Sequence, residues 1–284
     1  MRLKIAIQKS GRLSDKSKAL LRECGIKINN GKNQLMACSS NFPIDFLFLR
    51  DDDIPQYVED GVSDLGIIGE NVWLEKGKKV DIIKKLGFSK CRMCLAVPKS
   101  TNYKHLDFFN NKNIATSYPI ILRKYLTENN IKAEIHEISG SVEIAPNIGL
   151  AEGIFDIVST GSTLMMNGLK EVQTVLKSEA ILIANQNLST EKQTLLDELL
   201  FRIESVQRAK NSKYVVLNAP NDKVELISNI LPGMKSPTIV PLQQEGWSAL
   251  HSVISEDQFW EIIGKLKTAG AEGILVTPIE KMVF

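Results

Sequence analysis

The 284-residue sequence lacks the features that would place it in a membrane or on a nucleic acid. No uninterrupted apolar run approaches the roughly 18 to 20 residues of a membrane helix. The basic N-terminus is followed by only about five apolar residues before Gln8 and Lys9, too few for a secretion signal. The 35 basic and 33 acidic side chains leave a formal charge of +2, which provides no basic field for a polyanion. We therefore expect a cytoplasmic protein with no membrane or nucleic-acid partner.

Groups for covalent or metal-based catalysis are also scarce. The three histidines, His105, His136 and His251, lie in separate segments, and none adjoins a serine or cysteine with a nucleophile signature. The sequence contains no metal-ligand cluster, no GxGxxG motif and no Walker loop. The chemistry should therefore rest on positioning and charge stabilisation rather than on a covalent intermediate.

Cysteine is rare, but Cys91 and Cys94 have the CxxC spacing of redox and zinc sites. A lone CxxC lacks the second ligand pair of a structural zinc site. The surrounding stretch CRMCLAVP is typical of a strand, in which residues at this spacing point to opposite faces. We expect these cysteines to be core thiols in a reducing compartment.

Short apolar stretches alternate with amphipathic ones, which indicates an α/β protein with parallel strands and ligands at the carboxyl ends of those strands. The first predicted strands are 3–8, 45–50 and 64–69. A second set of predicted strands and helices covers 112–117, 119–130, 133–138, 143–151 and 154–159. A strand at 179–186 should then return to the first set, and a long helix should follow at 191–210.

These two sets imply two lobes hinged around a cleft, a shape that binds small molecules. We assign 1–101 and 179–210 to lobe I and 102–178 to lobe II. Residues 211–284 then form a third domain. Its predicted order of strand, helix, strand, strand, helix, strand is the split βαβ, ferredoxin-like plan.

The stretch IFDIVSTGSTL, residues 154–164, leads from a predicted strand into small hydroxylic residues. Backbone N–H groups and hydroxyls at a helix start hold a phosphate well, and a glycine lets the backbone close around it. Glu152 and Asp156 put two carboxylates near the same strand end, which suits sugar hydroxyls or a magnesium ion. A sugar phosphate satisfies both halves, and an ordinary polar turn remains the alternative. We call the following residues the hydroxyl loop: Ser159, Thr160, Gly161, Ser162 and Thr163.

Cationic residues follow two other predicted strands and are expected to face the same cleft. Lys9, Gly11 and Arg12 lie in the loop after the first strand, and Arg50 ends the second. Cations at strand ends suit a polyphosphate, for which arginine supplies a bidentate fork.

Acidic residues near these loops are harder to interpret. Asp51 begins a run of three acids, which could be only a solvated cap for the helix that starts near residue 54. In a further small-residue loop, GIIGENV, Glu70 could contact a base or a sugar. By itself each of these signals is weak.

Several long motifs follow one another along the whole chain: IAIQKSGRL, RDDDIP, DLGIIGENV, IATSYP, SGSVEIAPNIGLA, DIVSTGSTL, LPGMKSPTIVPL and ILVTPIEKM. In this order they resemble the long form of ATP phosphoribosyltransferase, the enzyme family that opens histidine biosynthesis. A slight departure is that Ser139 and Gly140 stand where the family often has asparagine and glycine. The resemblance implies a two-lobed, periplasmic-binding-protein-like catalytic unit with a C-terminal ferredoxin-like (ACT-like) regulatory domain.

The resemblance also implies a reaction, in which N1 of ATP attacks C1 of phosphoribosyl pyrophosphate and pyrophosphate leaves. The hydroxyl loop would bind the 5′-phosphate, with Glu152 and Asp156 near the ribose hydroxyls. Arg12 and Arg50 would be catalytic, because negative charge builds on the departing pyrophosphate. Mg²⁺ would bridge the pyrophosphate, with no protein ligand assigned. The implied nucleotide-binding residues are Lys9, Gly11, Arg12, Arg50, Asp51 and Glu70.

For the third domain, the resemblance implies inhibition by the end product L-histidine. Ser236 and Thr238, in LPGMKSPTIVPL, would hydrogen-bond the amino acid. A homo-hexamer is implied, with AMP as a further candidate inhibitor. The alternative hypothesis is a non-catalytic protein that binds a small molecule or senses an amino acid, because two hinged lobes also describe solute receptors.

Overall fold

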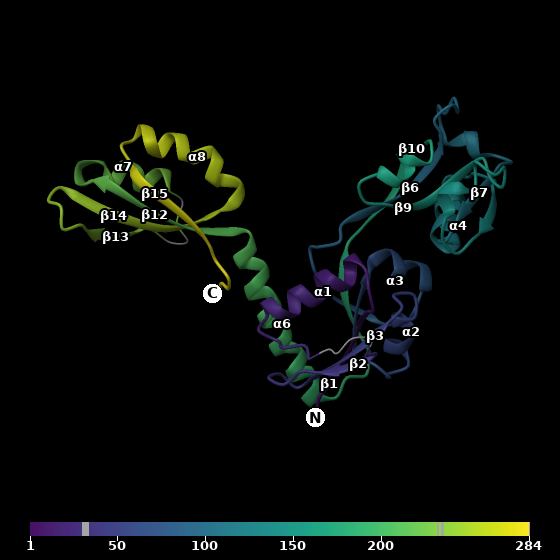
Figure 1. Cartoon of the computed structure of the whole chain (residues 1–284), viewed down its shortest axis with the longest axis horizontal. Coiled ribbons are helices and arrows are strands. Elements are labelled where there is room, and N and C mark those ends of the chain that lie inside the picture. The colour runs from purple at the N-terminus through teal and green to yellow at the C-terminus, as the bar shows by residue number, and fades with distance from the viewer. Residues whose placement is uncertain (30–33, 232, 234–235, 284) are drawn as a thin grey trace. The chain divides into compact units, whose positions relative to one another are not determined.

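The computed structural model describes residues 1–29, 34–231, 233 and 236–283, and Figure 1 labels its elements. The chain divides into two compact units, Met1–Ala19 with Lys27–Gln193 and Leu20–Ile26 with Thr194–Phe284. The first unit contains two sheets and the second contains one. This division falls inside helix α6 (Thr190–Lys210), so the domain boundaries expected from the sequence remain predictions.

The first sheet has the strand order β2-β3-β1-β4-β11-β5. β1 pairs in parallel with β3 and β4, as predicted, because a helix carries the chain back after each strand. β11 is antiparallel to β4 and β5, and β2 is antiparallel to β3, so the sheet is mixed and the expected parallel pairing holds for β1, β3 and β4. The strands are β1 (Leu3–Gln8), β2 (Met36–Cys38), β3 (Ile44–Leu49), β4 (Leu65–Gly69), β5 (Asp81–Lys85) and β11 (Ala180–Ala184).

Three helices follow the parallel strands β1, β3 and β4: α1 (Arg12–Glu23), α2 (Ile54–Glu59) and α3 (Glu70–Lys76). Pro55 lies in the first turn of α2, as predicted, where its missing N–H costs no helical hydrogen bond. Ile54 and Val58 of this helix are fully buried against the apolar side chains of the sheet. Each strand-to-helix loop is therefore held at the carboxyl edge of the sheet.

The second sheet has the order β10-β6-β9-β7-β8. β7 is parallel to β8 and β9, whereas β6 runs antiparallel to β9 and β10. Its strands are β6 (Cys91–Pro98), β7 (Asn113–Thr116), β8 (Glu134–Glu137), β9 (Gly153–Val158) and β10 (Leu169–Ser178), and its helices are α4 (Pro119–Glu128) and α5 (Ser162–Met166), with a short 3-10 helix, η1 (Leu106–Phe109). Phe109 and Phe155 are fully buried in its core.

The helix predicted at 143–151 is wrong. Only a 3-10 turn, η2 (Val142–Ile144), forms there, followed by further turns. Pro146 lacks the N–H that a helix would use, and Gly149 adopts a φ of +74°, which is outside the helical region. The edge strand β10 was not predicted, because its half-buried pattern carries charged residues where a central strand would be apolar.

Two neighbouring segments connect the first sheet with the second. Glu179 alone separates β10 from β11, and residues 86–90 separate β5 from β6. The segments bond to each other, since the Leu86 N–H donates to the Ala180 carbonyl at 2.8 Å and the Ala180 N–H donates to the Phe88 carbonyl at 3.0 Å. The predicted return of the chain to the first sheet is thus confirmed, and the two connections form one paired crossing.

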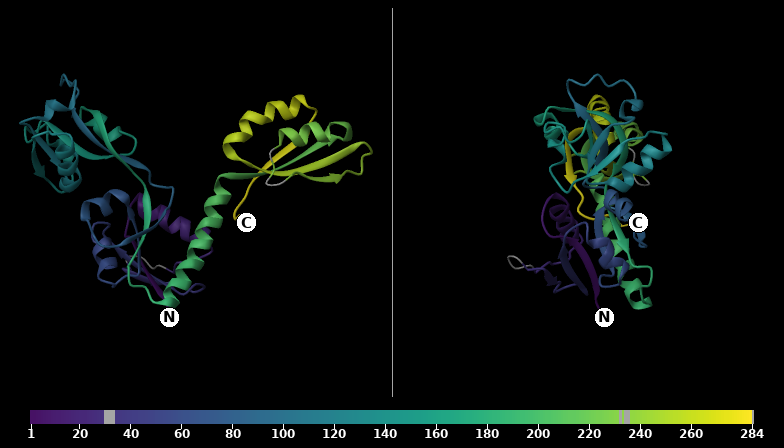
Figure 2. Two further views of the ribbon diagram at one scale, coloured as in Figure 1. Left: turned by 180° about the vertical axis from the view of Figure 1, so that it is seen from behind. Right: turned by 90° about the vertical axis from the view of Figure 1, so that its right-hand side faces the viewer.

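The third sheet has the order β13-β14-β12-β15, with every neighbouring pair antiparallel. Its elements follow the predicted ferredoxin-like order: β12 (Ser212–Pro220), α7 (Val224–Ile230), β13 (Thr238–Pro241), β14 (Trp247–Ser255), α8 (Glu256–Thr268) and β15 (Glu272–Pro278), with a short 3-10 helix, η3 (Asn221–Lys223), before α7. Figure 2 shows α7 and α8 on one face of this sheet, where they share an apolar core. No helix in the described part of the chain is long and apolar enough to span a membrane.

Glu75 joins helix α3 to the start of helix α4. Glu75 is only 6% exposed, and its carboxylate accepts hydrogen bonds from the backbone N–H groups of Ile120 at 2.9 Å and Ile121 at 3.0 Å. These are N–H groups of the first turn of α4, which have no partner inside the helix, and the Tyr118 side chain at the N-cap makes no capping bond. An acid from a different helix therefore caps α4.

We expect Glu75→Gln to destabilise the protein by about 1–3 kcal/mol. The glutamine amide has only one oxygen, so its NH₂ group would face one of the two buried backbone N–H donors, and the negative charge that strengthens both hydrogen bonds is lost. Thermal unfolding monitored by circular dichroism measures the loss. The matched control is Glu128→Gln on α4, where the side chain is 61% exposed and lies 4.0 Å from Lys124. Equal melting temperatures for the two variants would contradict the capping role.

Candidate functional site

Two adjoining cavities lie where loops of the first and second sheets meet. The larger, of about 450 Å³, takes its lining from both sheets, and the smaller, of about 230 Å³, is lined mainly by the loop after β9. Arg12, Ile157 and Ser159 line both, so the cavities are neighbours. The cleft between two α/β layers that the sequence predicted therefore exists as a hollow of the first unit.

The hydroxyl loop forms one wall of the smaller cavity, and all five of its residues line it. Gly161 adopts a φ of +83°, which lets the chain turn sharply from β9 into α5. Thr160 Oγ1 and Ser162 Oγ lie 3.0 Å apart. Within the described residues, no hydrogen bond uses the backbone N–H of Thr160 or Gly161. Because α5 has only five residues, these N–H groups and the hydroxyls, rather than a helix dipole, supply the donors.

Asp156 and Glu143 supply the carboxylates of the smaller cavity. Burial raises the pKa of Asp156 to about 6, the N–H of Ile157 at 2.7 Å opposes that rise, and the charge of Glu143 adds to it. Glu143 lies within the turn η2, at the start of the stretch predicted to be helical. Sequence reasoning missed it, although it stands in the quoted motif SGSVEIAPNIGLA.

Glu152 does not join this cavity, so its predicted place beside the loop is wrong. It precedes β9, and its carboxylate accepts the Asn113 N–H at 2.8 Å. The hydroxyl loop follows the other end of β9, roughly 20 Å away at 3.3 Å per strand residue. Residues close in sequence were expected to lie close in space, but an extended strand separates them.

Several predicted residues of the first sheet line the larger cavity. Gly11, with a φ of +98°, and Arg12 lie where β1 turns into α1, and Asp51 lies before α2. Burial raises the pKa of Asp51, and the neighbouring charge of Asp52 raises it further. These residues thus lie close to the hydroxyl loop, because Arg12 lines both their cavity and the cavity of the loop.

Three other predicted residues are not among those that line the cavities. Lys9 and Arg50 are exposed at the adjacent ends of β1 and β3, where the Lys9 N–H donates to the Leu49 carbonyl at 2.8 Å. Glu70 forms an ion pair with Lys85 at 3.0 Å, because the start of α3 directs it toward β5. The two cations lie at the carboxyl edge of the first sheet, and their role stays a prediction, whereas Glu70 has a partner elsewhere.

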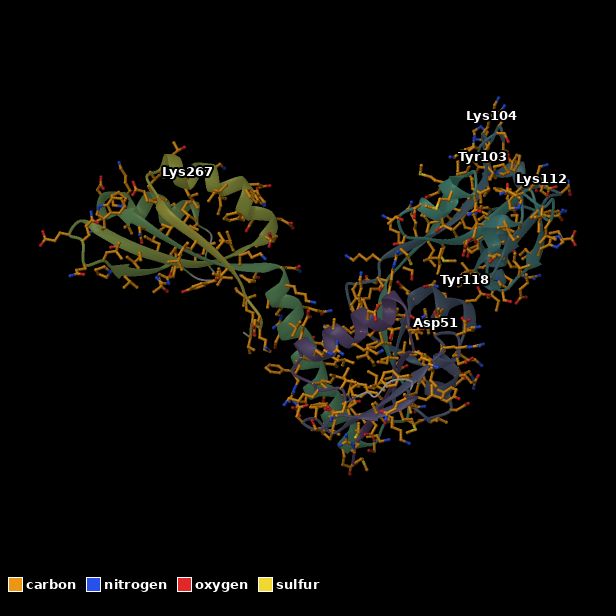
Figure 3. The ribbon with its side chains drawn as sticks, viewed as in Figure 1. Asp51, Tyr103, Lys104, Lys112, Tyr118 and Lys267 are labelled. Carbon is orange, nitrogen blue, oxygen red and sulfur yellow. The ribbon has the colours of Figure 1, made fainter. Side chains whose placement is uncertain are left out.

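The structure adds cavity residues that the sequence did not single out. Asn71, which is buried, accepts the Ser178 hydroxyl at 2.9 Å at the crossing between the sheets. Ser89 lines the larger cavity with a φ of +52° and a buried hydroxyl that has no partner within the described residues. Burial, with the nearby charges of Asp156 and Asp51, raises the pKa of Tyr118, which Figure 3 labels near Asp51.

The CxxC cysteines are separate free thiols, but only Cys94 is the core thiol expected from the sequence. Cys91 lines the larger cavity, and burial raises its pKa. Cys94 is buried, and its thiol donates to Glu171 at 3.0 Å. No group of three or more metal-binding side chains was found among the described residues.

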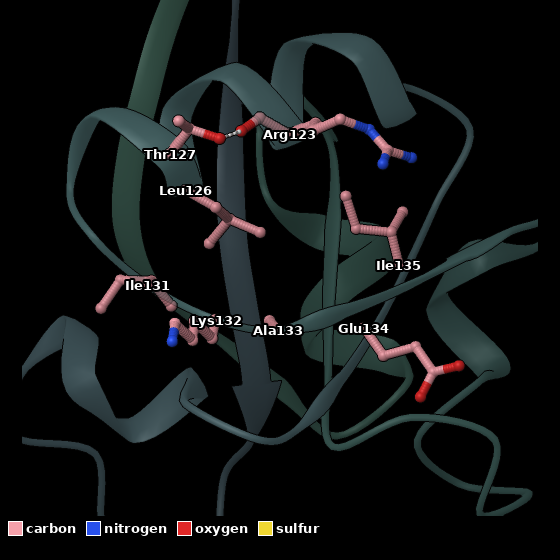
Figure 4. A pocket seen from close by; sticks show the side chains of 8 residues that line it. All are labelled: Arg123, Leu126, Thr127, Ile131, Lys132, Ala133, Glu134 and Ile135. Atoms are coloured by element: carbon pink, nitrogen blue, oxygen red, sulfur yellow. Dashed lines mark hydrogen bonds between the residues drawn. The ribbon is translucent and has the colours of Figure 1, made fainter.

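A further hollow of about 370 Å³ lies beside α4 and β8, as Figure 4 shows. Arg123, Lys132 and Glu134 are its charged residues. None of the predicted site residues lines it, so it is no part of the candidate site.

Comparison with known proteins identifies the family of this chain. The family model described as ATP phosphoribosyltransferase matches residues 50–205, and the model described as HisG, C-terminal domain, matches residues 209–281. A protein of Bacteroides thetaiotaomicron named ATP phosphoribosyltransferase is 61% identical over 281 residues, which is 99% of both chains. The chain belongs to the ATP phosphoribosyltransferase family. The predictions of the family and of a glycosyltransferase are thus confirmed.

Other members and structures extend the likeness. The ATP phosphoribosyltransferase of Cytophaga hutchinsonii is 59% identical, over 99% of this chain and 98% of that protein. A solved structure, the ATP phosphoribosyl transferase (HisG:HisZ) complex from Thermotoga maritima, matches with a TM-score of 0.61 at 30% identity, covering 71% of this chain and 98% of that chain.

A substrate-binding protein of an amino acid ABC transporter matches with a TM-score of 0.50 at 11% identity, covering 74% of this chain and 94% of that one. At so low an identity this match shows the fold alone. Together with the C-terminal match, it confirms the predicted fold class for this ATP phosphoribosyltransferase family member, a two-lobed receptor-like unit followed by a ferredoxin-like domain.

We expect Asp156→Asn to stabilise the protein above pH 6 and to leave its stability unchanged below pH 4. The native carboxyl holds its proton up to about pH 6, whereas the ordinary pKa is 3.8, so the wild type loses stability as the pH rises between these values. The neutral amide does not titrate and so avoids this loss. We expect the free energy of unfolding of the variant to exceed that of the wild type by on the order of 1–2 kcal/mol, after allowance for the partial exposure of the side chain.

Denaturant unfolding at pH 4 and pH 7.5 measures this difference. Asp222→Asn is the control, since that side chain is 74% exposed. A gain for Asp156→Asn that is equal at both pH values would contradict the burial of this carboxyl.

Proposed function

We propose that this chain transfers the phosphoribosyl group of phosphoribosyl pyrophosphate to N1 of ATP, giving phosphoribosyl-ATP and pyrophosphate, the first step of L-histidine biosynthesis. Membership of the family over nearly the whole chain supports the activity. The observation that carries the substrate assignment is one cavity in which a loop with hydroxyls and two unused backbone N–H groups adjoins a half-buried carboxylate. That pairing suits a phosphate attached to a polyol.

On the sugar side, the 5′-phosphate occupies the hydroxyl loop, where donors from Ser159 to Thr163 replace water around the anion. Asp156 and Glu143 accept hydrogen bonds from the ribose hydroxyls. With a pKa of about 6, Asp156 is mostly ionised at neutral pH and is therefore an acceptor there. Carboxylate and phosphate sites must stay apart, and the length of the ribose separates them.

On the nucleotide side, Arg12 is the residue best placed for the pyrophosphate, because it lines both cavities. Lys9 and Arg50 add positive charge at the same sheet edge, and Gly11 and Asp51 shape the space for ATP. Glu70 belongs to this group only if its ion pair with Lys85 opens.

The transition state has oxocarbenium character, so its charge lies on the ribose and on the departing pyrophosphate. Arg12 and Arg50 stabilise the pyrophosphate, and the carboxylate of Asp156 stabilises the positive ribose. The adenine N1 already carries a lone pair, so the protein needs no strong base. This agrees with a cavity whose residues position the two substrates and stabilise the charges of the transition state.

Mg²⁺ fits this site as a partner of the substrate. The oxygen donors at hand are Asp156 and Glu143, which are ligands that Mg²⁺ accepts, but they are fewer than a dedicated protein site requires. Asp156 and Glu143 would supply its protein contacts, and the bound ion would neutralise negative charge on the departing pyrophosphate.

Regulation is proposed for the ferredoxin-like domain, with the domain limits 1–101 and 179–210, 102–178 and 211–284. Ser236 and Thr238 are exposed, and Thr238 pairs with His251 across β13 and β14. Positions 232, 234 and 235 of the motif lie outside the described residues. L-histidine binding here, inhibition by AMP, a homo-hexamer and a cytoplasmic location complete the proposal.

The deciding experiment mixes the protein with ATP, phosphoribosyl pyrophosphate and Mg²⁺ and follows the absorbance of phosphoribosyl-ATP. Product formation supports the transferase. A protein that binds L-histidine but forms no product would instead be the amino-acid sensor.

We expect Thr160→Val and Thr163→Val each to raise the KM for phosphoribosyl pyrophosphate about tenfold, because each removes a hydroxyl donor to a charged group worth about 1.5 kcal/mol. The KM for ATP should change less than twofold. Thr127→Val is the control, since its hydroxyl bonds the Arg123 carbonyl inside α4. An unchanged KM for the sugar phosphate in both loop variants would remove the loop from the site.

We expect Thr238→Val to weaken inhibition by L-histidine at least fivefold while leaving kcat unchanged, because one hydrogen bond to the ligand is lost. Inhibition curves at fixed substrate concentrations measure the effect. Thr268→Val, on the exposed end of α8, is the control in the same domain. Identical inhibition of both variants would contradict the proposal that Thr238 of β13 binds L-histidine.

A further inference from the structure

Arg92 connects the hydroxyl loop to a strand on the far side of β6. The residue lies in β6, between β9 and β10. Its Nη1 donates to the backbone carbonyl of Ser159 at 3.2 Å, and its Nη2 donates to Glu171 of β10 at 2.7 Å. Nε also donates to both carboxylate oxygens, at 2.9 and 3.0 Å. One guanidinium thus joins the first residue of the loop to the edge strand.

Glu171 also accepts hydrogen bonds from two further donors. The thiol of Cys94 and the hydroxyl of Thr174 both donate to its Oε1, each at 3.0 Å. The Arg92 guanidinium, chiefly, holds the pKa of Glu171 down to about 2, so the carboxylate stays charged throughout the neutral range. Two-sided contact with a planar carboxylate fixes the plane of the guanidinium as well as its position.

The contact at Ser159 determines the direction of a donor in the loop. In a planar trans peptide, the carbonyl of one residue and the N–H of the next point in opposite directions. With the Ser159 carbonyl turned to Arg92, the Thr160 N–H is turned away from it. Thr160 lines the smaller cavity, and its N–H has no acceptor within the described residues.

We propose that Arg92, held by Glu171, is a positioning residue that locks the Ser159–Thr160 peptide so that the loop is ready for the phosphate before the substrate arrives. This inference rests on the proposed function, since it takes the phosphate of phosphoribosyl pyrophosphate as the occupant of the loop. A peptide already held in the binding orientation costs nothing to reorganise when the anion binds.

A purely structural role accounts poorly for this arrangement. The side chains of Arg92 and Glu171 are 35% and 27% exposed, and partly exposed ion pairs add little to stability. Stability alone would also not require the third contact to the loop carbonyl. The arrangement uses more donors than an ion pair needs, and the extra one reaches the substrate loop.

The chemistry of the guanidinium provides a selective test. Lysine keeps the positive charge and can still pair with Glu171, but its single nitrogen cannot occupy both the Nη1 position at the Ser159 carbonyl and the Nε and Nη2 positions at the carboxylate. Arg92→Lys therefore removes the link to Ser159 while keeping the ion pair. Thr174→Val is the matched control, because it removes a hydrogen bond to the same Glu171 without touching the loop.

The experiment compares the full-length wild type, Arg92→Lys and Thr174→Val by steady-state kinetics, by calorimetric binding of phosphoribosyl pyrophosphate and by thermal melting. For Arg92→Lys we expect the KM and Kd for phosphoribosyl pyrophosphate to rise about tenfold. The KM for ATP should stay within twofold, with a melting temperature close to that of the wild type. For Thr174→Val all four quantities should stay near the wild-type values.

Glu171→Gln gives a second, independent variant, because a neutral amide no longer orients the arginine. It should raise the same KM, and combining it with Arg92→Lys should add little further change. The inference is overturned if Arg92→Lys leaves the KM for phosphoribosyl pyrophosphate unchanged, or raises both KM values equally. A wild type that neither binds this compound nor forms phosphoribosyl-ATP overturns the proposed function itself, which is a distinguishable result.

Discussion

The paired crossing between the first and second sheets is the constraint on which the rest of the first unit depends. The Leu86 and Ala180 N–H groups bind across it, and the register places Cys91 opposite Ser178. Ser178 then bonds to Asn71 in the first turn of α3, so the crossing is tied to a helix start that lines the larger cavity. Loops that lie far apart in the sequence share one hollow because two antiparallel segments, rather than a single linker, join the layers.

Much of this fold was predictable because burial leaves a strong pattern in sequence. The apolar runs of β1, β3, β4 and β9 marked central strands, and the four strands of the third sheet followed in the expected order. The hydroxyl loop could be found because five small residues after a buried strand are unusual. Edge strand β10 escaped notice, since a half-buried strand admits charge on one face.

The errors have equally physical causes. Glu152 and Asp156 are close in sequence, but β9 is extended and carries them apart, whereas Glu143 reaches Asp156 through a turn of the chain. Such contacts depend on tertiary folding and leave no local pattern. The antiparallel direction of β11 likewise arises because the chain re-enters the first sheet from the edge at which it left. The residue preferences of a strand do not indicate whether it will pair parallel or antiparallel to its neighbours.

The raised pKa of Asp156 has a consequence for the energetics of binding. A carboxyl that titrates near pH 6 is part protonated in mildly acidic solution. A ligand that needs its charged form then drives the proton into the buffer, so each binding event is also an acid–base event. The heat of binding would depend on the ionisation enthalpy of the buffer, and the cavity would couple substrate occupancy to proton exchange with the solvent.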